Sequence, residues 1–305
     1  RKENNPLPSK EDNWIIREKM ERKKKLILLI ISFSIILGIG MGGEWVHNYS
    51  KYIHFKNKDL ATMTSGSIEW RKFYDMEFDQ ITKQQAKQIT EIYIESLYGE
   101  DAEFAESPEL KNIKSFEDLL KFPNVQYIKL GSGTTYEIRG KEVREEYLEW
   151  FSMEKNEKYP QALRDVLGKL EKLEWLQVKS DLVFEDLELV RQCKKLDHLE
   201  ICQNQLKSLN GIENIEINFA EFSENSLEDI SALENAGSIK YLILNDNLIE
   251  NYDVLLKVDG LLAVSFDMDK ENARQVAELL NKKGCIATEN ASDVYQRYWS
   301  ESKDK

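Results

Sequence analysis

The stretch HLEICQNQL at residues 198–206 decides the fold of this chain. Its frame is Leu-x-Ile-x-x-Asn-x-Leu, in which three aliphatic residues and one asparagine stand at fixed offsets. The frame recurs, and its first positions step by 23, 21, 22 and 22 residues: Leu176, Leu199, Ala220, Leu242 and Val264. A constant period of this kind indicates one structural unit that is repeated and stacked along an axis.

The residue types of the frame follow from the needs of a stacked coil. Periods of roughly 20–29 residues are typical of leucine-rich repeats, whose units bury their apolar faces only against neighbouring units. We therefore expect an α/β leucine-rich repeat solenoid with parallel short strands on the concave face. A buried amide has donors and an acceptor, so the polar column should satisfy backbone groups where the chain leaves the strand. This column comprises Asp181, Asn204, Asn225, Asn247 and Asp269.

The sequence outside the frames suggests how the chain is organised. The leucine-rich repeat domain is expected at residues 113–269, with a charged, helical insertion at about 134–165. Residues 80–112 are expected to form an N-terminal cap region, and residues 270–305 a C-terminal cap that seals the open end of the core. Residues 47–79 are polar and aromatic without a clean period, which indicates a membrane-proximal linker.

An apolar run near the N-terminus predicts a membrane anchor. Residues 26–43 carry no charge, and we expect a transmembrane helix in the lipid bilayer at 26–46. Residues 1–25 hold nine Lys or Arg against five Asp or Glu, which predicts a cytoplasmic tail and an extracellular C-terminal domain at the cell membrane. A cleaved signal peptide is the alternative, although no A-x-A-like site follows. Gly38 and Gly42 have the G-x-x-x-G spacing of helix pairs, which makes helix-mediated self-association a further hypothesis.

The residues between the inward aliphatic positions should project onto the concave face. We interpret this face as a protein-binding surface, because aromatic residues with polar handles are favoured interface anchors. The first column is almost wholly aromatic: Tyr127, Trp175, His198, Phe219 and Tyr241. The second column is mostly polar: Lys129, Gln177, Glu200, Glu221 and Ile243. Two alternatives stay open for the aromatic column, a stacking preference of neighbouring coils and a loop that covers the rings.

Composition and motifs argue against several functional classes. The chain has 42 Lys and Arg against 55 Asp and Glu, a net charge of −13, and such a chain repels phosphate backbones. We therefore expect no nucleic-acid partner. Three cysteines and three histidines show neither metal-ligand spacing nor a disulfide framework. Because no nucleophile or phosphate-binding motif is present either, we expect no catalytic residues, no metal and no cofactor.

Two repeats resemble a known family. LEICQNQLKSLNGI (199–212) and LILNDNLIENYDVL (242–255) resemble the short repeats of internalin-like surface proteins of Gram-positive bacteria. ITKQQAKQITEIYI (81–94) and IKSFEDLLKFPNVQYIKL (113–130) are similar to the segments that precede and begin those repeats. The resemblance covers roughly residues 81–269 and implies recognition of a protein partner through the concave sheet, without catalytic residues.

This chain departs from internalins in having few repeats and an anchor at its N-terminus rather than a C-terminal sorting signal. The departure leaves a second interpretation open. In that interpretation the chain is a structural or accessory subunit of a membrane-embedded assembly, such as a secretion or envelope complex.

Overall fold

The structure, a computed structural model, describes residues 51–57, 60–61, 81–94, 113, 115–131, 158–179 and 184–302. The chain divides into two compact units, Arg1–Tyr52 and Ile53–Lys305, and the fold described below is that of the second. The helix predicted at 26–46 lies outside the described residues. Within the described ranges, no helix has both the length and the apolar character that crossing a bilayer requires.

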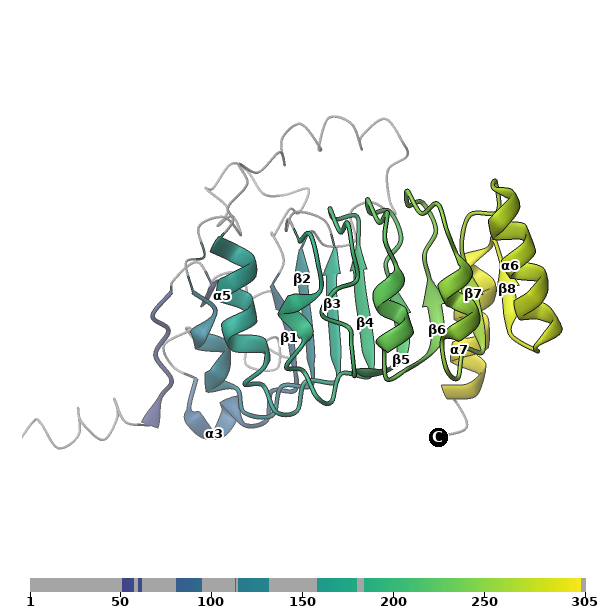
Figure 1. Cartoon of the computed structure of the whole chain (residues 1–305). Helices are drawn as coiled ribbons and strands as arrows, with labels where there is room; N and C mark the ends of the chain where they lie inside the picture. The colour runs from purple at the N-terminus through teal and green to yellow at the C-terminus, as the bar shows by residue number, and fades with distance from the viewer. Residues whose placement is uncertain are drawn as a thin grey trace, which may run out of the picture. The chain divides into compact units, whose positions relative to one another are not determined.

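In the described part of the chain, eight parallel strands form one open sheet, and their order in space is their order in sequence (Figure 1). The register sets the first position of each repeat frame beside the next, so Leu199 pairs with Leu176 on one side and with Ala220 on the other. The expected stacking of parallel short strands is therefore confirmed. The strands are β1 (Glu91–Ile94), β2 (Tyr127–Gly131), β3 (Trp175–Lys179), β4 (His198–Cys202), β5 (Glu216–Glu221), β6 (Ser238–Ile243), β7 (Ala263–Ser265) and β8 (Ile286–Thr288).

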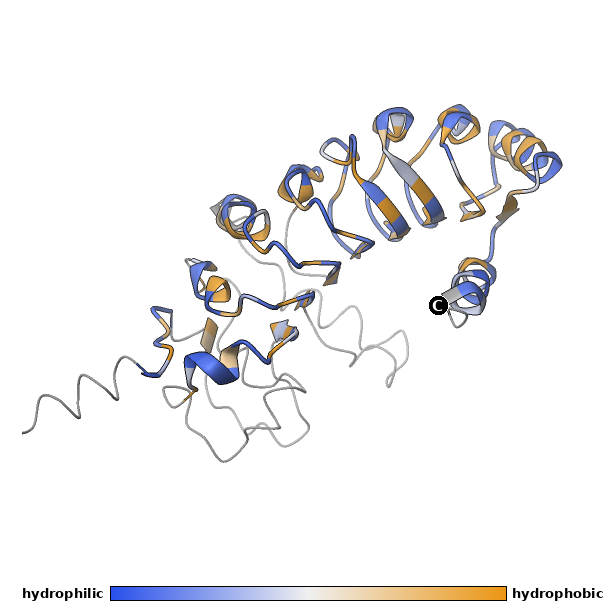
Figure 2. Cartoon of the chain, turned by 90° about the horizontal axis from the view of Figure 1, so that it is seen from below, coloured by the Kyte–Doolittle hydropathy of each residue, from blue (hydrophilic) through white to orange (hydrophobic). Residues whose placement is uncertain are grey.

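Short helical turns lie on the opposite side of the coils from the sheet (Figure 2). In the turn before β6, the backbone N–H of Leu233 donates to the carbonyl of Ile230 at 3.1 Å, and both side chains are buried. Apolar residues three apart suit a 3-10 turn, because its i and i+3 side chains share one face. These turns are η4 (Glu117–Lys121), η6 (Glu188–Val190), η7 (Ser231–Asn235) and η8 (Asp253–Lys257). The helices α5 (Lys158–Leu167) and α6 (Glu271–Lys282) pack in the same layer.

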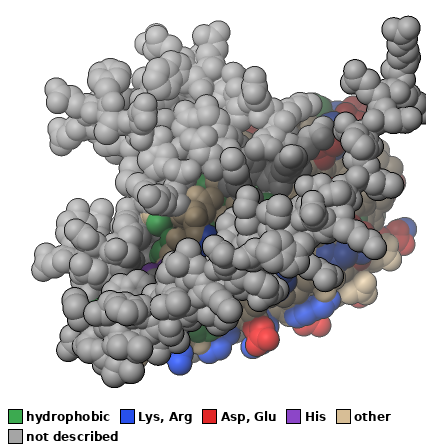
Figure 3. All heavy atoms as spheres, turned by 90° about the vertical axis from the view of Figure 1, so that its left-hand side faces the viewer, with side chains coloured by type: hydrophobic (Ala, Val, Ile, Leu, Met, Phe, Trp, Pro, Cys, Tyr) green, Lys and Arg blue, Asp and Glu red, His purple; other side chains and the backbone are tan. Residues whose placement is uncertain are grey.

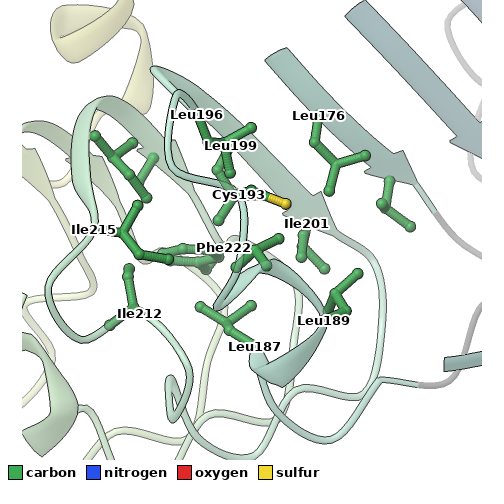
Figure 4. Packing of buried hydrophobic residues seen from close by; sticks show 14 of the residues in the cluster. Leu176, Leu187, Leu189, Cys193, Leu196, Leu199, Ile201, Ile212, Ile215 and Phe222 are labelled. Carbon is green, nitrogen blue, oxygen red and sulfur yellow. The ribbon is translucent and has the colours of Figure 1, made fainter. Parts of the chain in front are cut away.

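The apolar core runs inside the coils, between the sheet and the helical turns. Leu199 and Ile201 project inward from β4 and are fully buried. Figure 4 shows them beside Phe222 of the next coil and Leu187 and Leu189 near η6. Each coil covers the apolar side chains of its neighbour, so stacking closes the core.

Asparagine side chains hold the turn that follows the strand. The side-chain amide of Asn225 donates to the carbonyls of Ile201 at 2.7 Å and Phe222 at 3.1 Å, and its oxygen accepts from the N–H of Leu206 at 3.2 Å. Asn247 repeats this pattern one coil later, with its oxygen 3.0 Å from the backbone nitrogen of Leu227. One side chain therefore joins backbone groups of two neighbouring coils.

At the ends of the polar column, the side chains do not make the full set of hydrogen bonds that Asn225 and Asn247 make. Asn204 donates to the carbonyl of Cys202 at 2.7 Å, whereas its own oxygen is buried without a hydrogen bond to any described residue. Asp269 is exposed, and Asp267 instead accepts from the backbone N–H of Asp246 at 2.9 Å. Asp181 lies outside the described residues. The regular pattern is thus confined to the two coils whose turns carry Asn225 and Asn247.

Part of the predicted linker at 47–79 packs against the first coil. The buried carboxylate of Asp118 accepts the backbone N–H groups of Lys56 and Asn57, both at 2.8 Å. Ile53 is buried, and its N–H donates to the carbonyl of Ile81 at 2.8 Å. These contacts tie the segment that begins at Ile53 to the N-terminal end of the solenoid.

The region before β1 starts with a capped turn. Thr82 and Gln85 form a capping box at α3 (Lys83–Ala86), in which the hydroxyl of Thr82 accepts from the backbone N–H of Gln85 at 3.1 Å. Ala86 is buried beneath this turn. The cap therefore begins the apolar interior one strand ahead of the first repeat frame.

At the other end, α6 and β8 extend the solenoid beyond the last frame. Ala273, Val276 and Leu280 recur at helical spacing and are buried. Gly284 follows α6 with a φ of 89°, a left-handed conformation that glycine adopts at no steric cost. The predicted C-terminal cap range, 270–305, thus contains both an added strand and its covering helix.

The predicted insertion leaves the sheet register intact. Ile128 of β2 pairs with Leu176 of β3, although 48 residues separate them in sequence. The helix α5 lies between these strands in sequence and overlaps the end of the 134–165 range, the remainder of which is outside the described residues.

The contacts of Asn225 predict a large effect of its removal. In Asn225→Ala, buried carbonyls and the N–H of Leu206 lose their partner, which costs about 1–3 kcal/mol for a buried group left unsatisfied. Urea unfolding should show at least this loss in the free energy of unfolding. Asn210→Ala, at an exposed asparagine in the preceding coil, serves as the control and should change stability by less than about 0.5 kcal/mol.

Candidate binding surface on the concave face

The register brings the predicted aromatic column together. Tyr127 pairs with Trp175, and the ring centroids lie 5.1 Å apart. The ring of Trp175 stacks on His198 at 3.7 Å, and His198 stacks on Phe219 at 4.5 Å. Phe219 in turn pairs with Tyr241. The column therefore runs across β2 to β6, and its rings are in contact from Tyr127 to Phe219.

The second column forms a hydrogen-bonded ladder beside the rings. The hydroxyl of Tyr127 donates to the Gln177 side chain at 2.9 Å, and the amide of Gln177 donates to Glu200. Glu200 also contacts the Nε2 atom of His198 at 2.6 Å. One coil further, Glu221 accepts from the hydroxyl of Ser223 at 2.7 Å. The buried carboxylates are thus satisfied within the sheet surface, as buried charge requires.

The last helix of the chain, α7 (Ala291–Ser302), packs on this face of the sheet (Figure 2). Tyr298 is its central contact, with ring centroids 4.8 Å from Phe219 and 5.4 Å from Tyr241. The hydroxyl of Tyr298 lies 3.3 Å from the Nδ1 atom of His198. Tyr295 donates to Glu221, and Tyr241 donates to Glu301. The segment that covers the rings is therefore a helix, whereas the sequence had suggested a loop as one alternative.

The helix divides the predicted surface into a covered and an uncovered part. Phe219, Tyr241 and Ile243 are buried and form a small apolar cluster with Ala263, Val294 and Tyr298. His198, Glu200 and Glu221 are also buried. The uncovered part keeps partial exposure and consists of Tyr127, Lys129, Trp175 and Gln177. Trp299 of α7 is 46% exposed and lies 6.5 Å from Trp175, which adds a ring to the uncovered part.

Burial and hydrogen-bond partners shift the pKa values of several side chains on the concave face. Burial is the largest influence on the pKa of Glu200 and raises it, but His198, Lys179 and Gln177 together lower it further, so the net pKa lies below its usual value. Burial, together with the hydrogen bond to Glu301, raises the pKa of Tyr241 to about 12. Burial and the neighbouring Glu221 also raise the pKa of Tyr295. Both tyrosines are therefore neutral hydrogen-bond donors at neutral pH.

The described side chains offer little for thiol or metal chemistry. Burial raises the pKa of Cys193 to about 12 and that of Cys285 to about 11, and it also raises the pKa of Cys202. A thiol is a nucleophile only as the thiolate, and these thiols are protonated at neutral pH. Among the described residues, no three His, Cys, Asp or Glu side chains cluster as metal ligands would.

Sequence reasoning missed the residues of α7. Val294 and Tyr298 stand four apart, as do Tyr295 and Trp299, which is the spacing of one helix face. Asn290 precedes the helix, and its side-chain oxygen accepts from the N–H of Ser292 at 3.1 Å. This spacing and this polar start could have predicted a helix, although not its position on the concave face.

The lowered pKa of Glu200 predicts a pH-dependent contribution to stability. Its folded-state pKa lies below the ordinary value of 4.5, so the stabilisation is present above that value and is lost as the pH falls through the lowered pKa. We expect Glu200→Gln to be less stable than the unsubstituted chain at pH 7. In urea unfolding, the difference should shrink as the pH falls below 4.5 and through the lowered pKa. A difference independent of pH would contradict this role of the carboxylate.

The similarity of this chain to known proteins is found among solved structures. No model of a known protein family matches the chain, and no curated protein matches its sequence. Among solved structures, the chain is similar to an internalin from Listeria monocytogenes, with 14% sequence identity and a TM-score of 0.40. The match covers 77% of this chain and 68% of that one. The period and register of the coils, rather than this likeness, identify the fold as a leucine-rich repeat solenoid.

Proposed function

We propose that this chain is a non-catalytic recognition protein that binds another protein with the uncovered part of its concave face. The observation that carries the proposal is the half-exposed row of Tyr127 and Trp175, continued by Trp299. Aromatic side chains dominate the energetics of interfaces when they are held in fixed positions.

The uncovered part is rigid before any partner arrives. Trp175 is stacked on the buried His198, and Gln177 is held between Tyr127 and Glu200. Side chains that are already ordered lose little rotamer freedom on binding, so more of the contact energy contributes to affinity.

Figure 3, which views the molecule from the left-hand side of Figure 1, shows basic and acidic side chains interspersed along the lower border of the described surface.

We also propose that the domain is held at the cell membrane, with the repeats outside and residues 1–25 in the cytoplasm. The support is the uncharged run at 26–43 and the excess of Lys and Arg before it. Gly38 and Gly42 support pairing of two such helices as a further part of this proposal.

A cross-linker placed in the uncovered part tests the binding surface. Replacing Tyr127 by p-benzoylphenylalanine in the full chain, followed by irradiation of intact cells, is expected to give one dominant protein adduct that mass spectrometry identifies. The same replacement at Leu279, which is 45% exposed on α6, is the control and should not give that adduct. Equal adducts from both positions would refute the assignment of the surface.

The affinity of the identified partner gives a second, quantitative test. Trp175→Ala is expected to weaken binding of the purified partner by about 2 kcal/mol or more, as for a central interface anchor. Leu279→Ala should leave the dissociation constant within about two-fold, because single surface changes away from an interface are usually near neutral. Circular dichroism of both variants should match that of the unsubstituted chain, so that a loss of binding is separated from unfolding.

A further inference from the structure

A hollow of about 510 Å³ lies at the edge of the uncovered part, where β1 to β4 begin. Its lining includes Trp175 and His198 from the sheet and Tyr298 from α7. The helix therefore supplies a wall of this hollow. The helix that covers one part of the concave face thus also forms one side of a hollow in the uncovered part.

The interior of the hollow is formed by aromatic rings. Trp175 and His198 stack at 3.7 Å, and the ring of Tyr298 lies 5.6 Å from that of His198. Both ring nitrogens of His198 already have partners, Glu200 and Tyr298. The ring faces offer apolar surface, which suits the methylene groups of a long side chain, and the buried Nε1 atom of Trp175 has no hydrogen-bond partner among the described residues.

The rim of the hollow is acidic. Its lining residues include three acidic ones, Glu91, Glu174 and Asp197, and one basic one, Lys195. Glu174 and Asp197 are exposed, and within the described part of the chain neither carboxylate has an ion-pair or hydrogen-bond partner. They stand on neighbouring coils, since the N–H of Asp197 donates to the carbonyl of Glu174 at 2.8 Å. Like charges opposite each other on adjacent strands repel, and a cation between them removes the repulsion.

We propose that this hollow receives an arginine side chain of the protein partner, with its methylene groups against the rings and its guanidinium between Glu174 and Asp197. Arginine fits better than lysine, because its planar guanidinium has five N–H donors and can contact two carboxylates at once. The inference rests on the proposed function, to which it adds the chemistry of the partner. It requires α7 to stay in place, since Tyr298 closes the hollow.

The test uses a labelled tri-arginine amide and the matched tri-citrulline amide, which has the same stem without the charge. Both are titrated by fluorescence anisotropy into the full chain in neutral detergent micelles. The tri-arginine peptide is expected to bind at least about ten-fold more tightly than the tri-citrulline peptide, a difference that corresponds to about 1.4 kcal/mol. Glu174→Gln and Asp197→Asn should each weaken tri-arginine binding several-fold, and the double variant should abolish the preference for tri-arginine.

Glu216→Gln is the matched control, because Glu216 is an exposed carboxylate at the start of β5, beside a second hollow that three lysines also line. It should leave tri-arginine binding unchanged. An equal loss in Glu216→Gln would show that the net charge of the chain attracts the peptide, and equal binding of both peptides would show that the charge is not recognised. Either result overturns the proposal.

Two further measurements distinguish the arginine site from a structural role of Glu174 and from the proposed function. The urea midpoint of Glu174→Gln should equal or exceed that of the unsubstituted chain, because a repulsion is removed; a lower midpoint would make Glu174 a structural residue. A protein adduct from position 127 without a preference for tri-arginine overturns the arginine site alone. A preference for tri-arginine without any adduct overturns the proposed function alone.

Discussion

The hydrogen bonds that asparagine side chains make across the coils are the constraint on which the remaining structure depends. The residue directly before each asparagine has a left-handed backbone conformation. These residues are Gln203, Glu224 and Asp246, with φ values of 55°, 53° and 57°. Non-glycine residues adopt this conformation at a cost of about 1–2 kcal/mol. The side chains of Asn225 and Asn247 offset that cost by binding one carbonyl two residues before the turn and one carbonyl in the preceding coil. Because the turn is fixed in these two coils, their strands stay in register with the neighbouring strands, and side chains at equivalent positions form columns.

Those columns create a surface that the protein itself partly fills. In a solenoid each coil contacts only its neighbours, so the concave face is ordinarily open to solvent. Here the rings of Phe219 and Tyr241 would form an exposed apolar patch without α7, and the helix buries them. The polar contacts of α7 go to groups that the sheet already holds in place, His198 and Glu221. The uncovered rings are thus presented next to a wall that a bare repeat array lacks.

The sequence predicted the parts of the structure that repeat and missed the part that does not. The frame positions predicted the strands and their parallel stacking, because an inward aliphatic pair recurs in every coil, and β2 and β3 keep this register although 48 residues separate Ile128 from Leu176. The row of rings follows from the same register. The position of α7 could not be predicted, because it depends on contacts such as Tyr298 with His198 that lie far apart in sequence and occur once. Asp269 stands in phase but is exposed, since phase alone does not show whether the next coil supplies a partner.

Because α7 contacts residues far from it in sequence, it affects how the domain folds and opens. Tyr298 contacts His198 across 100 residues, and Tyr295 contacts Glu221 across 74. Arrays of repeats ordinarily unravel one unit at a time, because each unit depends only on the next. A helix that bridges β4 to β7 links those coils into one block, so that none of them opens alone without breaking contacts of α7. Amide protons of the C-terminal coils should therefore exchange together in one slow opening, while coils nearer the N-terminus fluctuate separately.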